Sequence, residues 1–382
     1  MANVSSSNGL EKRPKLRFPG FDEPYRTITL GQIASLVNRT DPTSNAPIMM
    51  LSAGNGFIMQ SEKYSRDNAG QSLKKYILLK KGELAYNHGA SKAKQYGCCY
   101  ELTEDEARIP YVYHCFKVSG TEYTPYVATA LNNPKIDRQL KRLVSSSVRM
   151  DGLLNISFDD YMSVILHLPS LKEQAHIADF LKKLDGRITA QEKLVASLKK
   201  YKRGLIKLVF DQTSMAAQQQ LPLSKMCISI SSGRTTVSDT NGSFPLFGST
   251  GVVGKTNTVE FDGDIVLVAR VGANAGRVNY YSGRCAVTDN TLVICVKEDI
   301  IQAKFLAYFL EYYDLHRLVF GSGQPLVTGG QLKKIEIPLV SSATQGCITK
   351  RFKALDNIIE AQETYALNLS RLKSGLMQQL FI

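Results

Sequence analysis

The sequence lacks tryptophan altogether, and its five histidines and seven cysteines are scattered along 382 residues. No histidine pair has the HExxH spacing of a zinc protease, and no cysteine pair has the CxxC spacing of a zinc or redox site. These absences argue against a metal site and against a disulfide framework. We therefore expect the cysteines to be reduced thiols of a protein core.

Long hydrophobic runs are missing as well. No stretch reaches the roughly 18 apolar residues that a membrane-spanning helix needs. The opening residues, MANVSSSNGLEKRPK, lack the apolar core of a secretion signal. We expect a cytoplasmic protein without a membrane partner, and a chain of 382 residues should form two or three domains.

Two glycine-rich stretches miss the spacing of nucleotide-binding motifs. In GSTGVVGKT (248–256), a P-loop needs glycine five residues before Gly254, where the sequence has Ser249. The following NTVEFDGDIVLVA has the composition of a strand, not of the helix that must cradle phosphate. VGANAG (271–276) does not have the G-x-G-x-x-G spacing of a dinucleotide site.

The motif with which amino-methyltransferases hold a target base, Asn/Asp-Pro-Pro-aromatic, is also absent. Asn133-Pro134 is followed by Lys135. Because no nucleophile, metal or cofactor motif is present, we do not expect this chain to be an enzyme, to bind a metal or to hold a cofactor.

Acidic residues are outnumbered, with 34 Asp and Glu against 47 Lys and Arg, which gives a formal net charge of +13. Such an excess indicates a polyanionic partner such as nucleic acid, although a basic soluble protein without one has the same composition. Part of the excess lies on one predicted helix. Residues 172–210 hold ten basic and four acidic side chains, a net charge of +6.

The chain contains an internal repeat. Shifted by 171 positions, residues 156–210 align with residues 327–381 without a gap. Fourteen of the 37 pairs between Gln174/Gln345 and Phe210/Phe381 are identical. We interpret the chain as a tandem duplication in which each copy ends in a long helix.

Both predicted helices carry apolar residues at alternating steps of three and four. Heptad spacing sustained over this length is typical of a coiled-coil seam, so the two helices are expected to pack against each other. The seam comprises Ile177, Leu181, Leu184, Ile188, Gln191, Val195, Leu198, Lys202, Leu205 and Val209 in the first copy. In the second copy it comprises Ile348, Phe352, Leu355, Ile359, Gln362, Ala366, Leu369, Lys373, Leu376 and Leu380.

Each seam has a glutamine near its centre, Gln191 in one copy and Gln362 in the other. In an antiparallel pair with pseudo-twofold symmetry, equivalent residues meet only near the middle, so these glutamines should approach each other; the alternative places both on the rim. A polar residue in a seam can fix register at a cost in stability. The 37 aligned residues make a spacer of about 55 Å that would hold two heads apart.

The fold class expected is α/β (α+β), with two β-rich heads separated by two long antiparallel coiled-coil helices in a tandem repeat. The heads open with TITLGQIASLVNRT and LPLSKMCISISSGRT, and ILLKKGELAYNHG (77–89) is similar to VEFDGDIVLVARVG (259–272), a strand, a glycine turn and a strand. The middles of the heads differ. The domains expected are a flexible tail (1–16), a first head (17–170), a central helix (171–214), a second head (215–340) and a C-terminal helix (341–382).

The sequence resembles the specificity (S) subunit, HsdS, of type I restriction–modification systems. The resemblance covers nearly the whole chain and is carried by several phrases together. These are PKLRFPGFDEPYRTITLGQI, LHLPSLKEQAHIADFLKKLDGRI, FPLFGSTGVVG, FDGDIVLVARVGANAGRV, AVTDNTLVI and GSGQPLVTGGQLKKIEIPL. One departure is that LPSLKEQ (168–174) becomes LVSSATQ (339–345), so an equally strong cap on the second helix is not expected.

The resemblance implies two target recognition domains, each reading one half of a split site in double-stranded DNA. It also implies that the helices set the half-site spacing and dock two methyltransferase (M) subunits. Catalysis would lie in these partners, which use S-adenosylmethionine, and in a motor that uses ATP and Mg. The sequence leaves open whether restriction (R) motor subunits join the assembly.

Base contacts need side chains that reach base edges, typically Arg or Lys for guanine and Asn or Gln for adenine. A phosphate contact or a solvated side chain is the alternative for each candidate. The candidates are Asn87, His88, Lys92, Lys94 and Arg149 in the first head, and Arg270, Asn274, Arg277, Arg284 and Gln324 in the second.

Two other hypotheses remain at this point. One is a non-catalytic coiled-coil scaffold whose two heads bind proteins, and the other is an enzyme that uses its glycine-rich loops on nucleotides. Salt-dependent binding to a split DNA sequence favours a specificity subunit, binding to a protein alone favours the scaffold, and ATP hydrolysis favours the enzyme.

Overall fold

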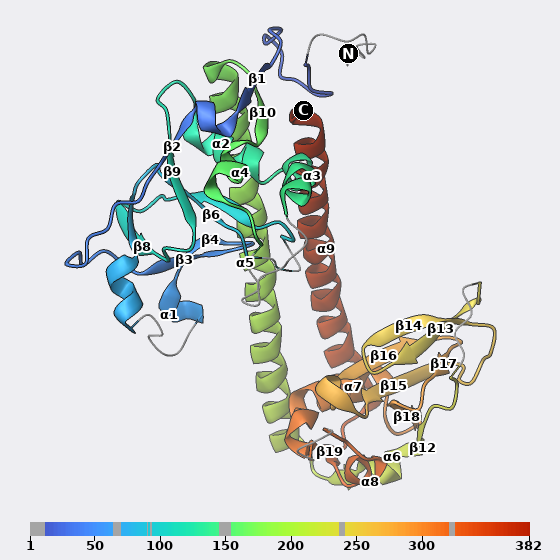
Figure 1. The fold of residues 1–382 in the computed structure, drawn as a ribbon. Helices are drawn as coiled ribbons and strands as arrows, with labels where there is room; N and C mark the ends of the chain where they lie inside the picture. The colour runs from blue at the N-terminus through green and yellow to red at the C-terminus, as the bar shows by residue number, and fades with distance from the viewer. Residues whose placement is uncertain are drawn as a thin grey trace. The chain divides into compact units, whose positions relative to one another are not determined.

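A computed structural model describes residues 12–63, 70–89, 91, 94–144, 154–236, 241–320 and 325–382. The chain divides into two compact units (Figure 1). The first comprises the chain up to Ala190 together with Ala366–Ile382, and the second comprises Gln191–Tyr365. Each unit therefore contains one β-rich head and a part of each long helix.

The first head is built on a four-stranded antiparallel sheet in the order β2-β9-β6-β7. These strands are β2 (Ala34–Leu36), β9 (His114–Val118), β6 (Leu84–Asn87) and β7 (Cys98–Glu101). Three antiparallel pairs complete it: β1 (Arg26–Thr29) with β10 (Ile165–Leu168), β3 (Met49–Ser52) with β4 (Gly56–Met59), and β5 (Ile77–Lys80) with β8 (Glu106–Ile109). In the core, the rings of Tyr86 and Tyr161 stack with centroids 3.8 Å apart.

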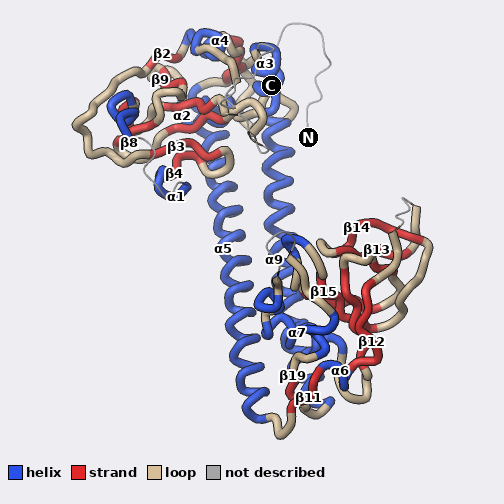
Figure 2. The backbone as a smooth tube through the Cα atoms, turned by 60° about the horizontal axis from the view of Figure 1, so that its bottom comes forward, coloured by secondary structure: helices blue, strands red, loops and turns tan. Residues whose placement is uncertain are grey.

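The second head has a four-stranded antiparallel sheet in the order β12-β18-β15-β16. These strands are β12 (Cys227–Ser232), β18 (Thr291–Val296), β15 (Asp264–Ala269) and β16 (Val278–Ser282). A smaller sheet joins β14 (Gly251–Thr256), β13 (Phe244–Gly248) and β17 (Ala286–Val287), and β11 (Gln220–Pro222) pairs with β19 (Glu336–Pro338). Figure 2 shows these strands in red.

The two heads share one topology, because β2-β9-β6-β7 and β12-β18-β15-β16 follow the chain in the same order. The strand–turn–strand unit predicted for both heads is present in the first head as β5, a glycine turn and β6. In the second head only the strand after the turn, β15, is present, because Phe261 before the turn forms just an isolated bridge with Cys285. Gly82 lies before β6 and Gly263 directly before β15, with φ of 80° and 105°, a conformation that glycine adopts without steric cost.

Short helices are present in both heads. The first head contains α1 (Gln60–Lys63), α2 (Thr124–Leu131), α3 (Pro134–Leu143) and α4 (Phe158–Met162); the second contains α6 (Leu223–Met226), α7 (Ala303–Tyr313) and α8 (Gly329–Lys333). Helices α2 and α4 of the first head correspond to α7 and α8 of the second. Helices α4 and α8 begin with the same capping box, at Ser157 and at Thr328. These caps lie 171 positions apart, so the repeat extends from the long helices into the heads.

The long helices are α5 (Leu171–Ala216) and α9 (Ser342–Leu380), close to the ranges expected for them. All predicted seam positions are buried or half-buried. Between residues 182 and 204, all residues outside the seam are exposed. In the first unit, Asp185 of α5 pairs with Lys373 of α9 at 2.5 Å, and Ile177 shares a core with Leu380. The helices are therefore antiparallel there, with a heptad seam between them.

The second unit shows the same antiparallel packing. The Gln191 amide donates to the Gln362 side-chain oxygen at 2.7 Å, as the pseudo-twofold relation predicted. Lys202, at a seam position, lies 2.8 Å from Asp356, which is the equivalent of the Lys373–Asp185 pair. The seam is thus apolar except at symmetry-related polar positions, which is the arrangement that specifies register.

One cysteine is more exposed than the sequence predicted. Five cysteines are buried and Cys295 is half-buried, but Cys347 is exposed on α9, so the expectation of seven core thiols is wrong for Cys347. Within the described ranges, no helix has the length and apolar character to cross a membrane.

Candidate nucleic-acid interface

Most of the candidate base-contacting residues lie on one equivalent loop in each head. In the first head the loop joins β6 to β7 and carries His88 and Lys94, with Asn87 at the end of β6. In the second head the loop joins β15 to β16 and carries Arg270, Asn274 and Arg277. The candidates that lie outside the described residues are Lys92, Arg149 and Gln324.

In the first head, the described residues of this loop that were candidates have partners within the head. His88 is 5% exposed, and its Nε2 lies 2.9 Å from the Val112 carbonyl. Asn87 uses its side-chain oxygen to accept the Gly89 amide, and the Lys94 ammonium donates to the Asn132 carbonyl at 2.7 Å. Burial removes the His88 ring from the surface in this structure, and its role as a base contact stays a prediction. Asn87 and Lys94 have structural partners in this state.

The loop of the second head opens onto one end of its sheet. The Arg270 amide donates to the Asn290 carbonyl, and the Arg270 carbonyl accepts the Val327 amide. Val271 forms a bridge with Leu326, so the segment before α8 borders the same loop. Three chain segments converge at this end.

Arg277 is exposed and lies directly before β16, with its Nη1 3.5 Å from the Thr250 carbonyl at the tip of the β13–β14 hairpin. Arg284 follows the far end of β16 and lies 3.3 Å from Asp262. A five-residue strand is about 17 Å long, so Arg284 does not belong with Arg277. The structure groups Arg270, Asn274 and Arg277 and separates Arg284 from them.

Sequence reasoning missed Arg234, which is exposed just after β12. The residues on either side of it are hydrogen-bonded to neighbouring strands: the Gly233 amide donates to the Thr291 carbonyl, and the Thr235 amide donates to the Val287 carbonyl. This end of β12 adjoins the start of β18, and therefore the end of β15. The signal available was the shared phrase, NRT at 38–40 against GRT at 233–235.

We call Arg234, Arg270 and Arg277 the arginine edge of the second head. Guanidinium groups stay charged and can donate two parallel hydrogen bonds to a guanine edge or a phosphate. Two carboxylates adjoin this edge: exposed Asp289, and Glu260, which accepts the Arg234 backbone amide at 2.9 Å. The first head differs, because the corresponding Arg39 is held by Glu83 at 2.7 Å.

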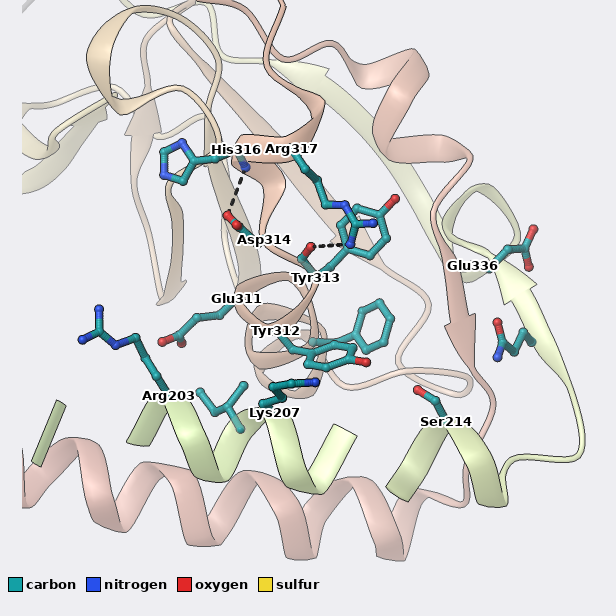
Figure 3. A pocket seen from close by; sticks show the side chains of 13 residues that line it. Arg203, Lys207, Ser214, Glu311, Tyr312, Tyr313, Asp314, His316, Arg317 and Glu336 are labelled. Atoms are coloured by element: carbon teal, nitrogen blue, oxygen red, sulfur yellow. Dashed lines mark hydrogen bonds between the residues drawn. The ribbon is translucent and has the colours of Figure 1, made fainter. Parts of the chain in front are cut away.

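A pocket of about 980 Å³ lies elsewhere in the second unit, between α5 and α7 (Figure 3). Its basic residues include Lys207, which pairs with Asp211 at 2.8 Å, and Arg317, which stacks on the Tyr313 ring and donates to the Tyr313 carbonyl. Glu336 and Asp314 also line it, so the lining has both signs of charge. In the part of the chain that the structure describes, no His, Cys, Asp and Glu side chains gather as a metal site.

The family model and the curated relative that this chain matches have similar descriptions. Residues 230–369 match a family model described as the type I restriction modification DNA specificity domain. The chain is 24% identical over 281 residues to the type I restriction enzyme MjaVIII specificity subunit of Methanocaldococcus jannaschii, covering 62% of this chain and 66% of that protein. The chain thus spans just under two thirds of the length of this curated relative.

Two solved structures share the fold. The S subunit of a type I restriction–modification system from M. genitalium has a TM-score of 0.65 at 15% identity, with 97% of this chain and 99% of that chain covered. A structure described for complex assembly and conformational transition of the type I R-M system has a TM-score of 0.57 at 16% identity, with 96% and 98% covered. At these identities, the likeness establishes the architecture.

Proposed function

We infer that this chain, which belongs to the family of type I restriction–modification specificity subunits, is the subunit that reads DNA for its complex. Each head recognises one half of an asymmetric, two-part site in double-stranded DNA. The chain itself performs no catalysis; methyl transfer from S-adenosylmethionine, and any cleavage driven by ATP, belong to its partners. Because its target is genomic DNA, it acts in the cytoplasm.

The observation that carries this proposal is that both heads have the same sheet topology, which we call the frame, but different loops. The two sheets share a strand order, yet the equivalent loops hold a buried His88 in one head and the exposed Arg277 in the other. Two equivalent frames with different surfaces suit two different base sequences. Direct readout depends on which side chains the loops present, whereas the frame only positions them.

The long helices carry a second apolar stripe beside the seam. On α5, Leu194, Tyr201, Leu208 and Met215 recur every seven residues. On α9, Ile358 and Tyr365 occupy the equivalent heptad position, and these six side chains are between 42% and 86% exposed. The other flank of the seam is polar, since Lys199 and Glu363 pair there at 2.5 Å. Heptad-spaced apolar residues facing solvent suit packing against further helices.

We therefore propose that the stripe docks helices of the methyltransferase subunits, and that the helix lengths set the gap between half-sites. Helix α5 has 46 residues, a length of about 69 Å, and α9 has 39 residues, about 58 Å. A rigid coiled coil keeps a constant span, whereas a flexible linker would not.

The test is single-molecule sequencing of genomic DNA from cells that express this chain with its cognate methyltransferase subunits. We expect one two-part motif carrying N6-methyladenine that is absent without this chain. Tyr201→Asp should abolish the motif and the co-purification of the methyltransferase, whereas Lys200→Asp, at the neighbouring exposed position, should retain both. No new motif, with a methyltransferase shown to be active alongside another specificity subunit, would support a protein scaffold instead.

A further inference from the structure

The β13–β14 hairpin of the second head has an irregularity that exposes two adjacent apolar side chains. Phe247 pairs with Val252 and Leu246 pairs with Gly254, so Val253 has no partner of its own and forms a β-bulge. In a regular strand, successive side chains point to opposite faces. Here Val252 is 61% exposed and Val253 is 50% exposed, because the bulge turns both outward.

The hairpin has a narrow tip flanked by glycines and an unpaired strand edge, and both allow a partner to come close to its backbone. Gly248 pairs with Gly251 around a two-residue tip, Ser249-Thr250, and Gly251 has a φ of 110°. A side chain at Gly248 would lie 2.9 Å from the Val253 side chain, so glycine is needed there for Val253 to lie flat across the hairpin. Strand β14 is the edge of its sheet, and its backbone is open to a partner on one side.

The hairpin segment that carries the two valines is basic. Arg277 of the arginine edge reaches the hairpin tip at Thr250, and exposed Lys255 lies on β14 itself. Residues 244–256 contain no Asp or Glu. An apolar patch set among cations fits a polyanion that carries apolar groups. The major groove of DNA is such a surface, because it admits a two-stranded ribbon and displays the thymine methyl group between phosphate backbones.

We propose that the β13–β14 hairpin enters the major groove and that Val252 and Val253 contact thymine methyl groups, so the half-site of the second head contains at least one A·T pair read through its methyl. This inference rests on the proposed function. The hairpin of the first head, β3–β4, pairs residue for residue without a bulge around Ala53-Gly54-Asn55, so this readout is confined to the second head.

The experiment measures binding of the complex of this chain and its methyltransferase subunits to duplexes of the sequenced motif at one salt concentration. Each thymine is replaced in turn by deoxyuridine, which lacks only the methyl. Losing one buried methyl should weaken binding about fourfold at one or two positions. The Val252→Ala, Val253→Ala double variant should bind the thymine duplex several-fold more weakly and should no longer distinguish deoxyuridine.

Ile228→Ala is the matched control, since Ile228 is 73% exposed on β12 at the end away from Arg234. It should keep both the affinity and the sensitivity to deoxyuridine. The inference is overturned if no thymine replacement affects the wild-type complex, if the second half-site has no A·T pair, or if the double variant loses its methyltransferase subunits instead. Absence of any two-part motif would refute the proposed function itself, which is a separate result.

Discussion

Gln174 in α5 and Gln345 in α9 occupy equivalent positions, and both are buried where a long helix meets its head. The side-chain oxygen of each accepts the amide that begins a helix of the head, Tyr123 at 2.9 Å for α2 and Gln302 at 2.8 Å for α7. The side-chain nitrogen of each donates, at 3.0 Å, to the carbonyl five residues earlier in the chain. We call these contacts the first and second joints.

The first joint is charged. Gln174 also donates to Glu122 at 2.6 Å, and Glu122 pairs with Arg26 at 2.9 Å. Beside it, the fully buried carboxylate of Glu173 accepts two hydrogen bonds from Arg17, at 2.9 and 2.8 Å. A guanidinium and a carboxylate in this fork arrangement form a strong, geometrically specific pair.

The second joint is neutral. Gln345 donates to the Ile300 carbonyl at 3.0 Å, and no carboxylate takes the place of Glu173, because Thr344 stands there. The helix begins instead with Ser341, whose hydroxyl accepts the Thr344 amide at 3.2 Å. The loss of Pro, Leu and Glu from this segment therefore did not leave α9 without a cap.

The difference separates two kinds of interaction. Both joints keep a glutamine side chain that hydrogen-bonds to backbone groups buried where the long helix meets its head. If such a backbone group were left unpaired, the cost in free energy would be about that of a lost hydrogen bond. The joints differ in the interaction beside the glutamine, which is an ion pair in the first joint and a hydroxyl cap in the second.

The largest difference between the joints is expected from Glu173→Ala and Thr344→Ala, which are substitutions at equivalent positions. Glu173→Ala leaves the Arg17 guanidinium, whose side chain is 14% exposed, without its carboxylate, and should lower the free energy of unfolding of the first head by about 3–5 kcal/mol. Thr344→Ala, on the exposed side of α9, should cost about 0.5 kcal/mol or less. Hydrogen exchange measured by mass spectrometry assigns each loss to its head.

Equal losses of protection at the two joints would show that the buried carboxylate of Glu173 contributes no more than the exposed side chain of Thr344 at the equivalent position. Loss of protection in the second head on Glu173→Ala would show that the two units do not unfold independently.

The helices could be predicted well from the sequence, whereas the interface could not. A heptad seam is a local, periodic pattern, and the 171-residue offset located Gln191 opposite Gln362 without any knowledge of the heads. Burial of loop residues depends on contacts far apart in the sequence. The burial of His88 could not be predicted, because it depends on Val112, 24 residues away on another segment.

The arginine edge and the bulge show the same limit. Arg234 is placed near Arg270 only by the pairing of β12 with β18 and of β18 with β15, which the order of residues does not reveal. Read alone, GVVGKT is an ordinary strand; that Val253 forms a bulge is decided by its register against Leu246 and Phe247.

A smaller effect is expected from the residue that the joints share. Gln174→Ala and Gln345→Ala should each destabilise their own head by about 1–3 kcal/mol, since each leaves a buried amide and carbonyl unpaired. The loss should be greater for Gln174, because the Glu122 side chain is 1% exposed and loses a donor. Gln379→Ala, on the exposed face of α9, is the control and should stay within about 0.5 kcal/mol. A greater loss for Gln345 would contradict the charged-joint argument.

The smallest expected effect is on pH dependence, and it should distinguish the heads. Burial lowers the pKa of His114 and of His167 in the first head, whereas the second head contains one histidine, His316, which is exposed. The unfolded chain binds protons at these two histidines near pH 6.5 and the folded head binds them less readily. The stability of the first head is therefore complete above that pH and declines as the pH falls through and below it.

The slope should approach at most about 1.4 kcal/mol per pH unit for each histidine in urea unfolding between pH 7.5 and 5.5. Burial raises the pKa of Glu101 and of Asp137, but these carboxyls act with the opposite sign, because the folded head binds their protons more readily than the unfolded chain does. His114→Gln keeps an N–H donor for the Ile156 carbonyl, 2.9 Å from Nε2, and removes one of the two titrations, so it should reduce the slope of the first head and leave that of the second head unchanged. An unchanged slope in this variant would mean that His114 is protonated as readily in the folded head as in the unfolded chain.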